Sequence, residues 1–264
     1  MAPPLRSGRG EGRDTVSYAP SGDASLGILA SLRGQICDGA ISSGFAMDCP
    51  NVGAMANSTL SNFERYERIA TFYDCLDLPF EYGWHRRIRP RLFRDLSGRI
   101  LDVGVGTGRN FPFYPPGTHV VGVDSSPAML ARAERRIDSS AAASIELKAM
   151  DATALDFPDD SFDAVVATFL FCVLPDESQL AVLRELGRVV KAGGAIRLLN
   201  YVRPRGAGLS VIAKLCQPFA AWAFAASFDR RTEESVTEAG LELLDSRYVI
   251  FDLIKLIEAR KRSS

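Results

Sequence analysis

A short apolar strand that runs directly into three glycines constrains the fold most. Residues 99–103 read Arg-Ile-Leu-Asp-Val, and Gly104, Gly106 and Gly108 follow at alternate positions. Because glycine has no Cβ, the backbone can turn sharply here and approach a bound molecule closely. A buried strand that turns into a helix through such a loop is typical of α/β proteins that bind a nucleotide-like ligand.

Strand and helix signals alternate along the chain around this loop. We expect strands at 99–103, 119–123, 144–149, 162–171 and 195–201, and a closing antiparallel pair at 241–249 and 251–259. Helical patterns are expected at 127–137, 179–191 and 232–239. This alternation is the rhythm of βαβ units and predicts a Rossmann-like, doubly wound α/β domain with seven mostly parallel strands.

Proline and glycine predict where several of these helices begin, bend or end. Pro127 fits the first turn of its helix, and Gly193-Gly194 and Gly240 fit glycine stops at the ends of the other two. Two further helices are expected upstream, at 61–74 after a capping-box pattern and at 81–96. The second is basic, and Pro90 predicts that it is broken or bent.

Composition divides the chain into two parts. Residues 1–58 are rich in small and polar residues without a regular period, which predicts a disordered extension before a domain at 59–264. A start codon placed too early, with Met55 as the true start, and a transit-like segment are the alternatives. The five cysteines lack any C-x-x-C spacing and only two histidines are present, so we expect neither disulfides nor a metal site.

Net charge and hydropathy indicate a soluble, cytoplasmic protein. The net charge of −1 gives no overall attraction to nucleic acid. No charge-free run reaches the roughly 18 residues of a membrane span. The nearest approach is 209–228, which Pro218 interrupts, and we interpret it as a substrate lid or as a plain core helix.

Three acids lie at the ends of three successive predicted strands. Asp102 lies two residues before the first glycine, Asp124 ends the next strand, and Asp151 follows the third. Asp124 comes about 20 residues after the first glycine, where an acid that accepts ribose hydroxyls is expected. Asp102 can neutralise an ammonium, and Asp151 with the Ala152 N–H can bind an adenine edge. Together these acids predict a cleft for a cationic nucleoside.

These segments resemble the class I S-adenosylmethionine (SAM)-dependent methyltransferases over residues 62–261. The resemblance lies in 101–108, 121–130, 151–152 with 157–163, and 186–194. It implies SAM as the cofactor, with the methionine moiety near the glycine loop, the ribose at Asp124 and the adenine near Met129. The residues expected to bind the cofactor are Tyr66, Tyr73, Asp102, Gly104, Gly106, Gly108, Asp124, Ser125, Met129, Asp151, Ala152 and Thr168.

Within that superfamily the chain is similar to bacterial phosphatidylethanolamine N-methyltransferases, which are themselves similar to ubiquinone/menaquinone C-methyltransferases. The similarity lies in Tyr66 to Asp74, in 171–175 and in 252–259. It implies N-methylation of a phospholipid headgroup; the alternative is C-, O- or S-methylation of a quinone or another small apolar molecule. A binding module without catalysis is a further alternative. Nucleic-acid methylation is disfavoured, because Thr168-Phe-Leu-Phe replaces the expected catalytic motif.

The acceptor side of the site is less constrained. Tyr73, Asp74 and Tyr201 are candidates to accept a proton from the acceptor or to orient it. Arginines 86, 87, 89, 91 and 94 form a basic segment that fits either an anionic membrane surface or a solvated helix face. Arginines 203, 205, 230 and 231 flank the apolar segment and are candidates to hold a phosphate or carboxylate. The sequence does not determine the oligomeric state.

Overall fold

The computed structural model describes residues 66, 73–75, 78, 80–204, 206, 215, 227–228 and 231–262. The predicted extension at 1–58, the capping box before the first helix and most of the apolar segment at 209–228 lie outside these residues. Within the described part of the chain, no helix is long and apolar enough to cross a membrane.

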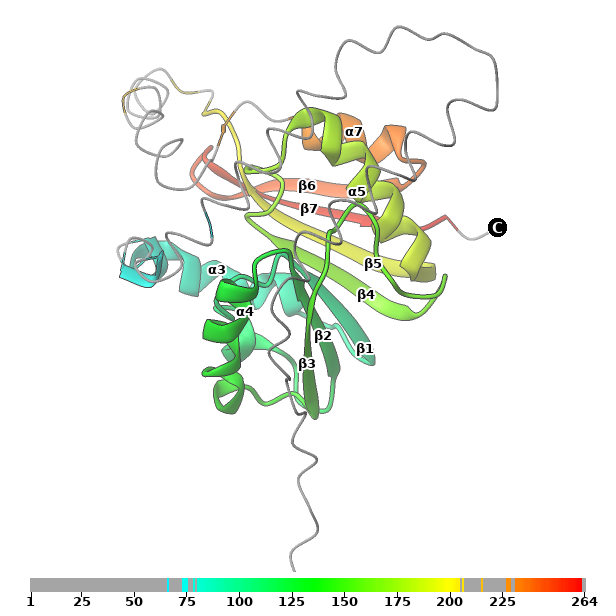
Figure 1. Ribbon diagram of the computed structural model, residues 1–264. Helices are drawn as coiled ribbons and strands as arrows, with labels where there is room; N and C mark the ends of the chain where they lie inside the picture. The colour runs from blue at the N-terminus through cyan, green and yellow to red at the C-terminus, as the bar shows by residue number, and fades with distance from the viewer. Residues whose placement is uncertain are drawn as a thin grey trace, which may run out of the picture. The chain divides into compact units, whose positions relative to one another are not determined.

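A seven-stranded mixed sheet forms the centre of the domain (Figure 1). Its strands are β1 (Arg99–Val103), β2 (His119–Asp124), β3 (Ser144–Ala149), β4 (Phe162–Thr168), β5 (Val190–Tyr201), β6 (Glu242–Ile250) and β7 (Ile254–Arg260). Their order is β3-β2-β1-β4-β5-β7-β6, and β7 runs antiparallel to both of its neighbours. The predicted Rossmann-like sheet and its closing antiparallel pair are confirmed.

Helices cover both faces of the sheet, as Figure 1 shows. The helical elements are η1 (Glu81–His85), α3 (Arg86–Phe93), η2 (Phe111–Phe113), α4 (Pro127–Glu134), η3 (Ile137–Ser139), α5 (Asp176–Val189) and α7 (Thr232–Glu238). The side chains of α3 and α4 pack into one core cluster, and those of α5 and α7 pack into the other. Strand β4 is covered on both faces in this way and buries six of its seven residues, which explains why its sequence is almost continuously apolar.

Alternate residues of β1 enter the two cores. Leu101 and Val103 face the α5–α7 core, whereas Ile100 faces the α3–α4 core. By the same alternation, Asp102 lies on the α3–α4 face. A carboxylate in the central strand is therefore completely buried next to α3.

The helix expected at 81–96 was predicted to be broken or bent near Pro90, and the break was wrong. Helix α3 continues through Pro90 to Phe93, and the irregular turn lies upstream, where η1 is a π-helix. In that turn the N–H of Arg86 donates to the carbonyl of Glu81, five residues earlier. Because Pro90 has no N–H to offer the carbonyl of Arg86, one hydrogen bond is lost without ending the helix.

The predicted glycine stop at Gly193-Gly194 was also wrong. Helix α5 passes directly into β5 at Val190, so both glycines lie within the strand, where the pairing with β4 shifts register. Gly193 has a φ of 72°, and a Cβ on Gly194 would lie 2.7–2.9 Å from atoms of Val190, Lys191 and Asp163. The glycines are needed for close backbone approach at this irregularity rather than for a helix cap.

Strand β4 ends earlier than predicted. It stops at Thr168, because Phe169 has a φ of 57° and leaves the extended conformation. The expected strand to Phe171 is therefore shortened, and 169–174 form a turn at the carboxyl end of the sheet.

Candidate functional site

The glycine loop follows β1 in a conformation that requires glycine. Gly104, Gly106 and Gly108 have φ values of 71°, 55° and 78°. The N–H groups of Gly104 and Val105 both donate to the carbonyl of Val123, at 2.8 and 3.0 Å, which fixes the bend against β2. A Cβ on Gly104 would lie 3.0 Å from Leu170, whereas one on Gly106 would meet only a backbone oxygen at 4.0 Å. The loop therefore leaves space beside Gly106 that a side chain would fill.

Asp124 at the end of β2 holds this loop in place. Its Oδ2 accepts the N–H of Gly106 and its Oδ1 accepts the N–H of Ser126, both at 2.9 Å. Ser126 caps α4, because its hydroxyl accepts the N–H of Met129 at 3.2 Å. Of the other predicted cofactor residues here, Ser125 is exposed and Met129 is buried. One carboxylate thus fixes both the loop and the start of α4.

Asp102 is fully buried and only half satisfied. Its Oδ2 accepts the hydroxyl of Tyr114 at 2.6 Å and the amide of Asn110 at 2.8 Å. Its Oδ1 is also buried and has no hydrogen-bond partner among the described residues. Burial raises the pKa of Asp102 to about 6, although the two hydrogen bonds and the charge of Arg89 lower it. A buried, unsatisfied carboxylate oxygen is costly, so this atom is suited to an ammonium donor from a ligand.

Asn110 connects Asp102 to a buried ion pair that sequence reasoning missed. Its Oδ1 accepts from Arg89 at 2.6 Å, and its amide also donates to Thr168 at 3.0 Å. Arg89 in turn donates to Oε2 of Glu81 through two nitrogens, at 2.9 and 3.2 Å. The chain of contacts from Glu81 to Asp102 therefore orients the buried acid, and the charge of Arg89 partly offsets the effect of burial on its pKa.

The predicted basic segment is wrong in one residue, Arg89. It was grouped with Arg86, Arg87, Arg91 and Arg94, but only 5% of its surface is exposed, whereas the other four are exposed. Because Arg89 lies on the inward face of α3 beside Ile88 and Leu92, its charge serves the interior and not a membrane surface. Helical periodicity of the neighbouring apolar residues was the signal that could have identified it.

Asp74 lies in a cluster of arginines. Its carboxylate accepts from the hydroxyl of Thr107 at 2.9 Å and forms ion pairs with Arg136, Arg109 and Arg132 at 2.7, 3.2 and 3.4 Å. Although burial alone would raise it, the pKa of Asp74 is lowered by hydrogen bonds from Arg136 and Thr107 and by the arginine charges. An acid stabilised in its ionised form is a weak proton acceptor, which disfavours the predicted catalytic role.

Asp74 brings a preceding helix next to the glycine loop. Tyr66 and Tyr73 are both helical, and their ring centroids lie 6.1 Å apart. Since Tyr73 directly precedes Asp74, and Asp74 contacts Thr107 in the loop, Tyr73 belongs to a segment docked on the loop. Both tyrosines remain predicted cofactor residues.

Tyr201, the third predicted proton acceptor, lies in an aromatic cluster at the end of β5. Its hydroxyl is 2.8 Å from Nε2 of His85, and its ring stacks on Phe169 with centroids 5.0 Å apart. Burial, with the charges of Arg89 and Arg109, lowers the pKa of His85 to about 3. His85 is therefore a neutral imidazole beside the Tyr201 hydroxyl at neutral pH.

The structure brings most of the predicted cofactor residues together at the carboxyl ends of β1, β2 and β4. The charge of Asp124 raises the pKa of Asp102, so the two acids act on each other, and Asn110 joins Asp102 to Thr168. Asp151 follows β3, and the N–H of the preceding Met150 donates to the carbonyl of Asp124 at 3.0 Å. Asp151 itself is exposed, and its described side-chain contacts are to the backbone and hydroxyl of Thr153, both at 2.8 Å. Ala152 packs partly buried against the α5–α7 core.

Comparison with known proteins agrees with this arrangement. The family described as "Methyltransferase domain" matches residues 100–194. A phosphatidylethanolamine N-methyltransferase from Cereibacter sphaeroides is 40% identical over 124 residues, which cover 47% of this chain and 60% of that protein. A demethylmenaquinone methyltransferase from Thermotoga maritima is 31% identical over 175 residues, which cover 62% of this chain and 73% of that protein.

Solved structures support the fold. A SAM-dependent methyltransferase from Methanosarcina mazei aligns with a TM-score of 0.51 at 22% identity, over 65% of this chain and 96% of that chain. The chain spans about 60% of the length of the curated relatives with the higher identities. The matched relatives, the sheet order and the glycine loop with its acids identify the chain as a member of the SAM-dependent methyltransferase family.

Proposed function

We propose that this chain transfers a methyl group from SAM to the amine of a phospholipid headgroup of the phosphatidylethanolamine kind. The observation that carries the donor side is the buried Oδ1 of Asp102 near the end of β1, which has no hydrogen-bond partner among the described residues. The residues present fit the cofactor. Asp102 would receive its ammonium, the space beside Gly106 would admit its tail, and Asp124 would accept from its ribose.

SAM supplies a methyl group already activated by a sulfonium. The chain therefore has to bind, align and exclude water, rather than generate a nucleophile of its own. The network from Glu81 through Arg89 and Asn110 holds Asp102 in one orientation, and Asp124 fixes the loop. This rigidity supports alignment of the donor with the acceptor.

Support for an amine acceptor comes from the Cereibacter sphaeroides relative, whose name states phosphatidylethanolamine N-methylation. Such an amine must lose a proton before it can attack. Tyr201 is our preferred residue to orient the acceptor, with its hydroxyl 2.8 Å from Nε2 of His85. Because the pKa of His85 is about 3, this imidazole is a poor base, and in our proposal the amine loses its proton to solvent before it attacks. Tyr73 remains a candidate that orients the acceptor, whereas the arginine cluster makes Asp74 the weakest of the three.

Peripheral contact with an anionic membrane surface would bring the enzyme to such a substrate. Arg86, Arg87, Arg91 and Arg94 are exposed on α3 and directly after it. Each cation near an anionic leaflet contributes about 1 kcal/mol. We include this contact in the proposal without Arg89, which is buried.

A quinone acceptor is the second candidate. The demethylmenaquinone methyltransferase from Thermotoga maritima aligns over 175 residues, a longer stretch than the Cereibacter sphaeroides protein does. C-methylation of a quinol ring would use the same donor site and the same aromatic cluster around Tyr201. The two candidates therefore differ only in the acceptor.

Incubation of the full chain with methyl-labelled SAM tests both candidates. One arm contains phosphatidylethanolamine vesicles, and the other contains demethylmenaquinol in detergent. We expect label in methylated ethanolamine lipid. Label confined to the quinol, or absent from both fractions while SAM still binds, would refute the phospholipid proposal.

A further inference from the structure

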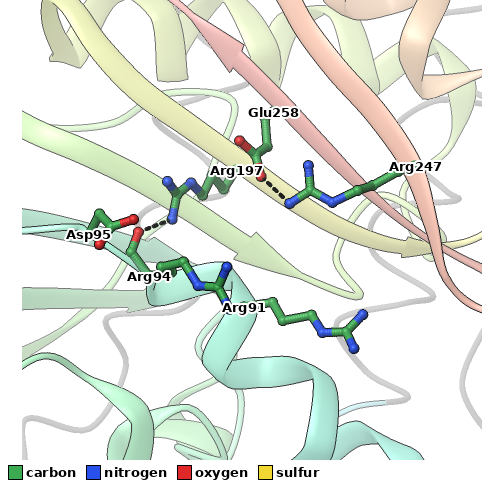
Figure 2. Close-up of a pocket in the computed structure, with 6 residues that line it drawn as sticks. All are labelled: Arg91, Arg94, Asp95, Arg197, Arg247 and Glu258. Carbon is green, nitrogen blue, oxygen red and sulfur yellow. Dashed lines mark hydrogen bonds and ion pairs between the residues drawn. The ribbon is translucent and has the colours of Figure 1, made fainter.

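A second charged site lies away from the glycine loop, on the α3 face of the sheet (Figure 2). It is a pocket of about 400 Å³, lined by Arg91, Arg94, Asp95, Arg197, Arg247 and Glu258. Arg197 lies four residues before the carboxyl end of β5, which places it about 13 Å along the strand from Tyr201. The pocket is therefore separate from the donor site.

The charges that line the pocket do not balance. Four arginines face two carboxylates in the lining. One of the carboxylates, Glu258, binds Arg247 at 2.7 Å, and Arg247 also forms an ion pair with Asp245, which lies outside the lining. The side chains of Arg91 and Arg94 make no ion pair with the described part of the chain, and both are exposed. Two guanidinium groups thus reach the pocket without a carboxylate of their own.

Arg197 forms the inner wall of the pocket. Its Nη1 donates to the carbonyls of Leu92, at 3.0 Å, and of Arg94, which ties the end of α3 to β5. Its Nε and Nη2 have no hydrogen-bond acceptor in the parts of the chain that the structure describes. Burial lowers the pKa of Arg197, and the positive charges of Arg247 and Arg94 lower it further. The negative charges of Glu258 and Asp95 raise this pKa in part. The half-buried guanidinium would gain from an anion.

We propose that this pocket binds a phosphate group. Guanidinium groups match the tetrahedral oxygens of a phosphate with paired N–H donors, and the lining has an excess of two positive charges. Arg91, Arg94 and Arg247 are exposed at its opening, so the phosphate can belong to a larger molecule. The shared chemistry fits a phospholipid headgroup or a soluble phosphate compound. This site does not depend on the acceptor proposed above.

Two charge-matched double variants test the site. Arg91→Gln with Arg94→Gln removes the two unpaired pocket cations. Arg86→Gln with Arg87→Gln removes two exposed cations from the same helix outside the pocket. All four positions are exposed, and retained SAM binding shows that each variant is folded. Inorganic phosphate binding is measured by calorimetry, and binding to phosphatidylglycerol vesicles, with phosphatidylcholine vesicles as the neutral reference, by co-sedimentation.

We expect the pocket variant to weaken phosphate binding by about tenfold or more, and the control variant to change it by less than about twofold. Suppose that the pocket variant loses more vesicle binding than the control variant does, and that inorganic phosphate displaces the protein from the vesicles. The phosphate group that the pocket binds then belongs to a lipid headgroup. If vesicle binding is equal in both variants, the source is a soluble phosphate compound. Equal losses in both assays, or no phosphate binding by the unmodified chain, would overturn the proposal.

Discussion

The donor site and the arginine pocket both contain buried or half-buried charges, but the charges of the two regions differ in how many of them have partners within the protein. At the donor site, Arg89 has Glu81 and Asn110 as partners, and Asp102 has Tyr114 and Asn110. Within the described part of the chain, Oδ1 of Asp102 has no partner. In the pocket, arginines outnumber acids, and Arg91, Arg94 and Arg247 are exposed to solvent. From this difference we infer that the donor site is organised to hold a single cationic group, whereas the arginine pocket is organised to attract an anion.

The largest effect is expected for Arg89→Ala. The change leaves Glu81 buried without its main counter-charge and removes a 2.6 Å hydrogen bond from Asn110. Removal of one partner of a buried ion pair costs about 3–5 kcal/mol, and urea unfolding measures it. Arg87→Ala on the same helix is the control and should change the free energy of unfolding by less than about 0.5 kcal/mol. If the free energy of unfolding fell by a similar small amount in both variants, Arg89 would not be part of a stabilising buried network, and the contrast between the donor site and the arginine pocket would be wrong.

Asp102→Asn separates binding from stability. The amide keeps an oxygen for Tyr114 and Asn110 but cannot neutralise an ammonium, so we expect SAM affinity to fall by about tenfold or more. The free energy of unfolding at neutral pH should not fall, because the folded pKa of about 6 lies above the unfolded value of 3.8. For such a group, stability declines as pH rises from about 4 to about 6, and the neutral amide escapes this cost.

Calorimetry with SAM measures the first effect, and urea unfolding measures the second. Asp138→Asn, an exposed acid outside the site, carries the same charge change and should alter neither quantity. Unchanged affinity in Asp102→Asn would remove this residue from the donor site.

The pH dependence of SAM affinity is the third prediction. The ionised form of Asp102 binds the ammonium, so affinity should be constant above about pH 7 and fall by about tenfold for each pH unit well below 6. His85 does not titrate in this range, because its pKa is about 3, and the pKa of Asp74 is lowered. Titration calorimetry from pH 5 to pH 8 tests this range. A dependence that persists unchanged in Asp102→Asn would assign it to another group.

The smallest effect is expected for the pocket arginines. Arg91→Gln with Arg94→Gln should change the free energy of unfolding by less than about 0.5 kcal/mol, because neither side chain has an ion pair in the described part of the chain. Urea unfolding of this double variant, compared with Arg89→Ala, gives the contrast directly. A loss of several kcal/mol would mean that the pocket arginines stabilise the fold instead of awaiting a ligand.

The predictions from sequence were most accurate where a pattern is local. Strand periodicity predicted the bounds of β1 and β3, and Pro127 and Gly240 correctly predicted a helix start and a helix stop. The predictions from sequence failed where a glycine or proline can serve more than one structural role. Gly193-Gly194 looks like a helix stop in sequence, but the sheet uses it for close backbone approach.

The sequence alone therefore determined the α/β alternation, the glycine spacing and the acids near the carboxyl ends of β1 and β2, because these depend on residues close together in the chain. Only the tertiary structure decided which charges are buried and which are free. Arg89 and Arg91 are two residues apart on one helix, yet one enters a buried ion pair and the other opens onto a pocket built with Arg197 and Arg247. The physical reason is that the cost of a charge depends on its burial and its partners, and distant strands supply both.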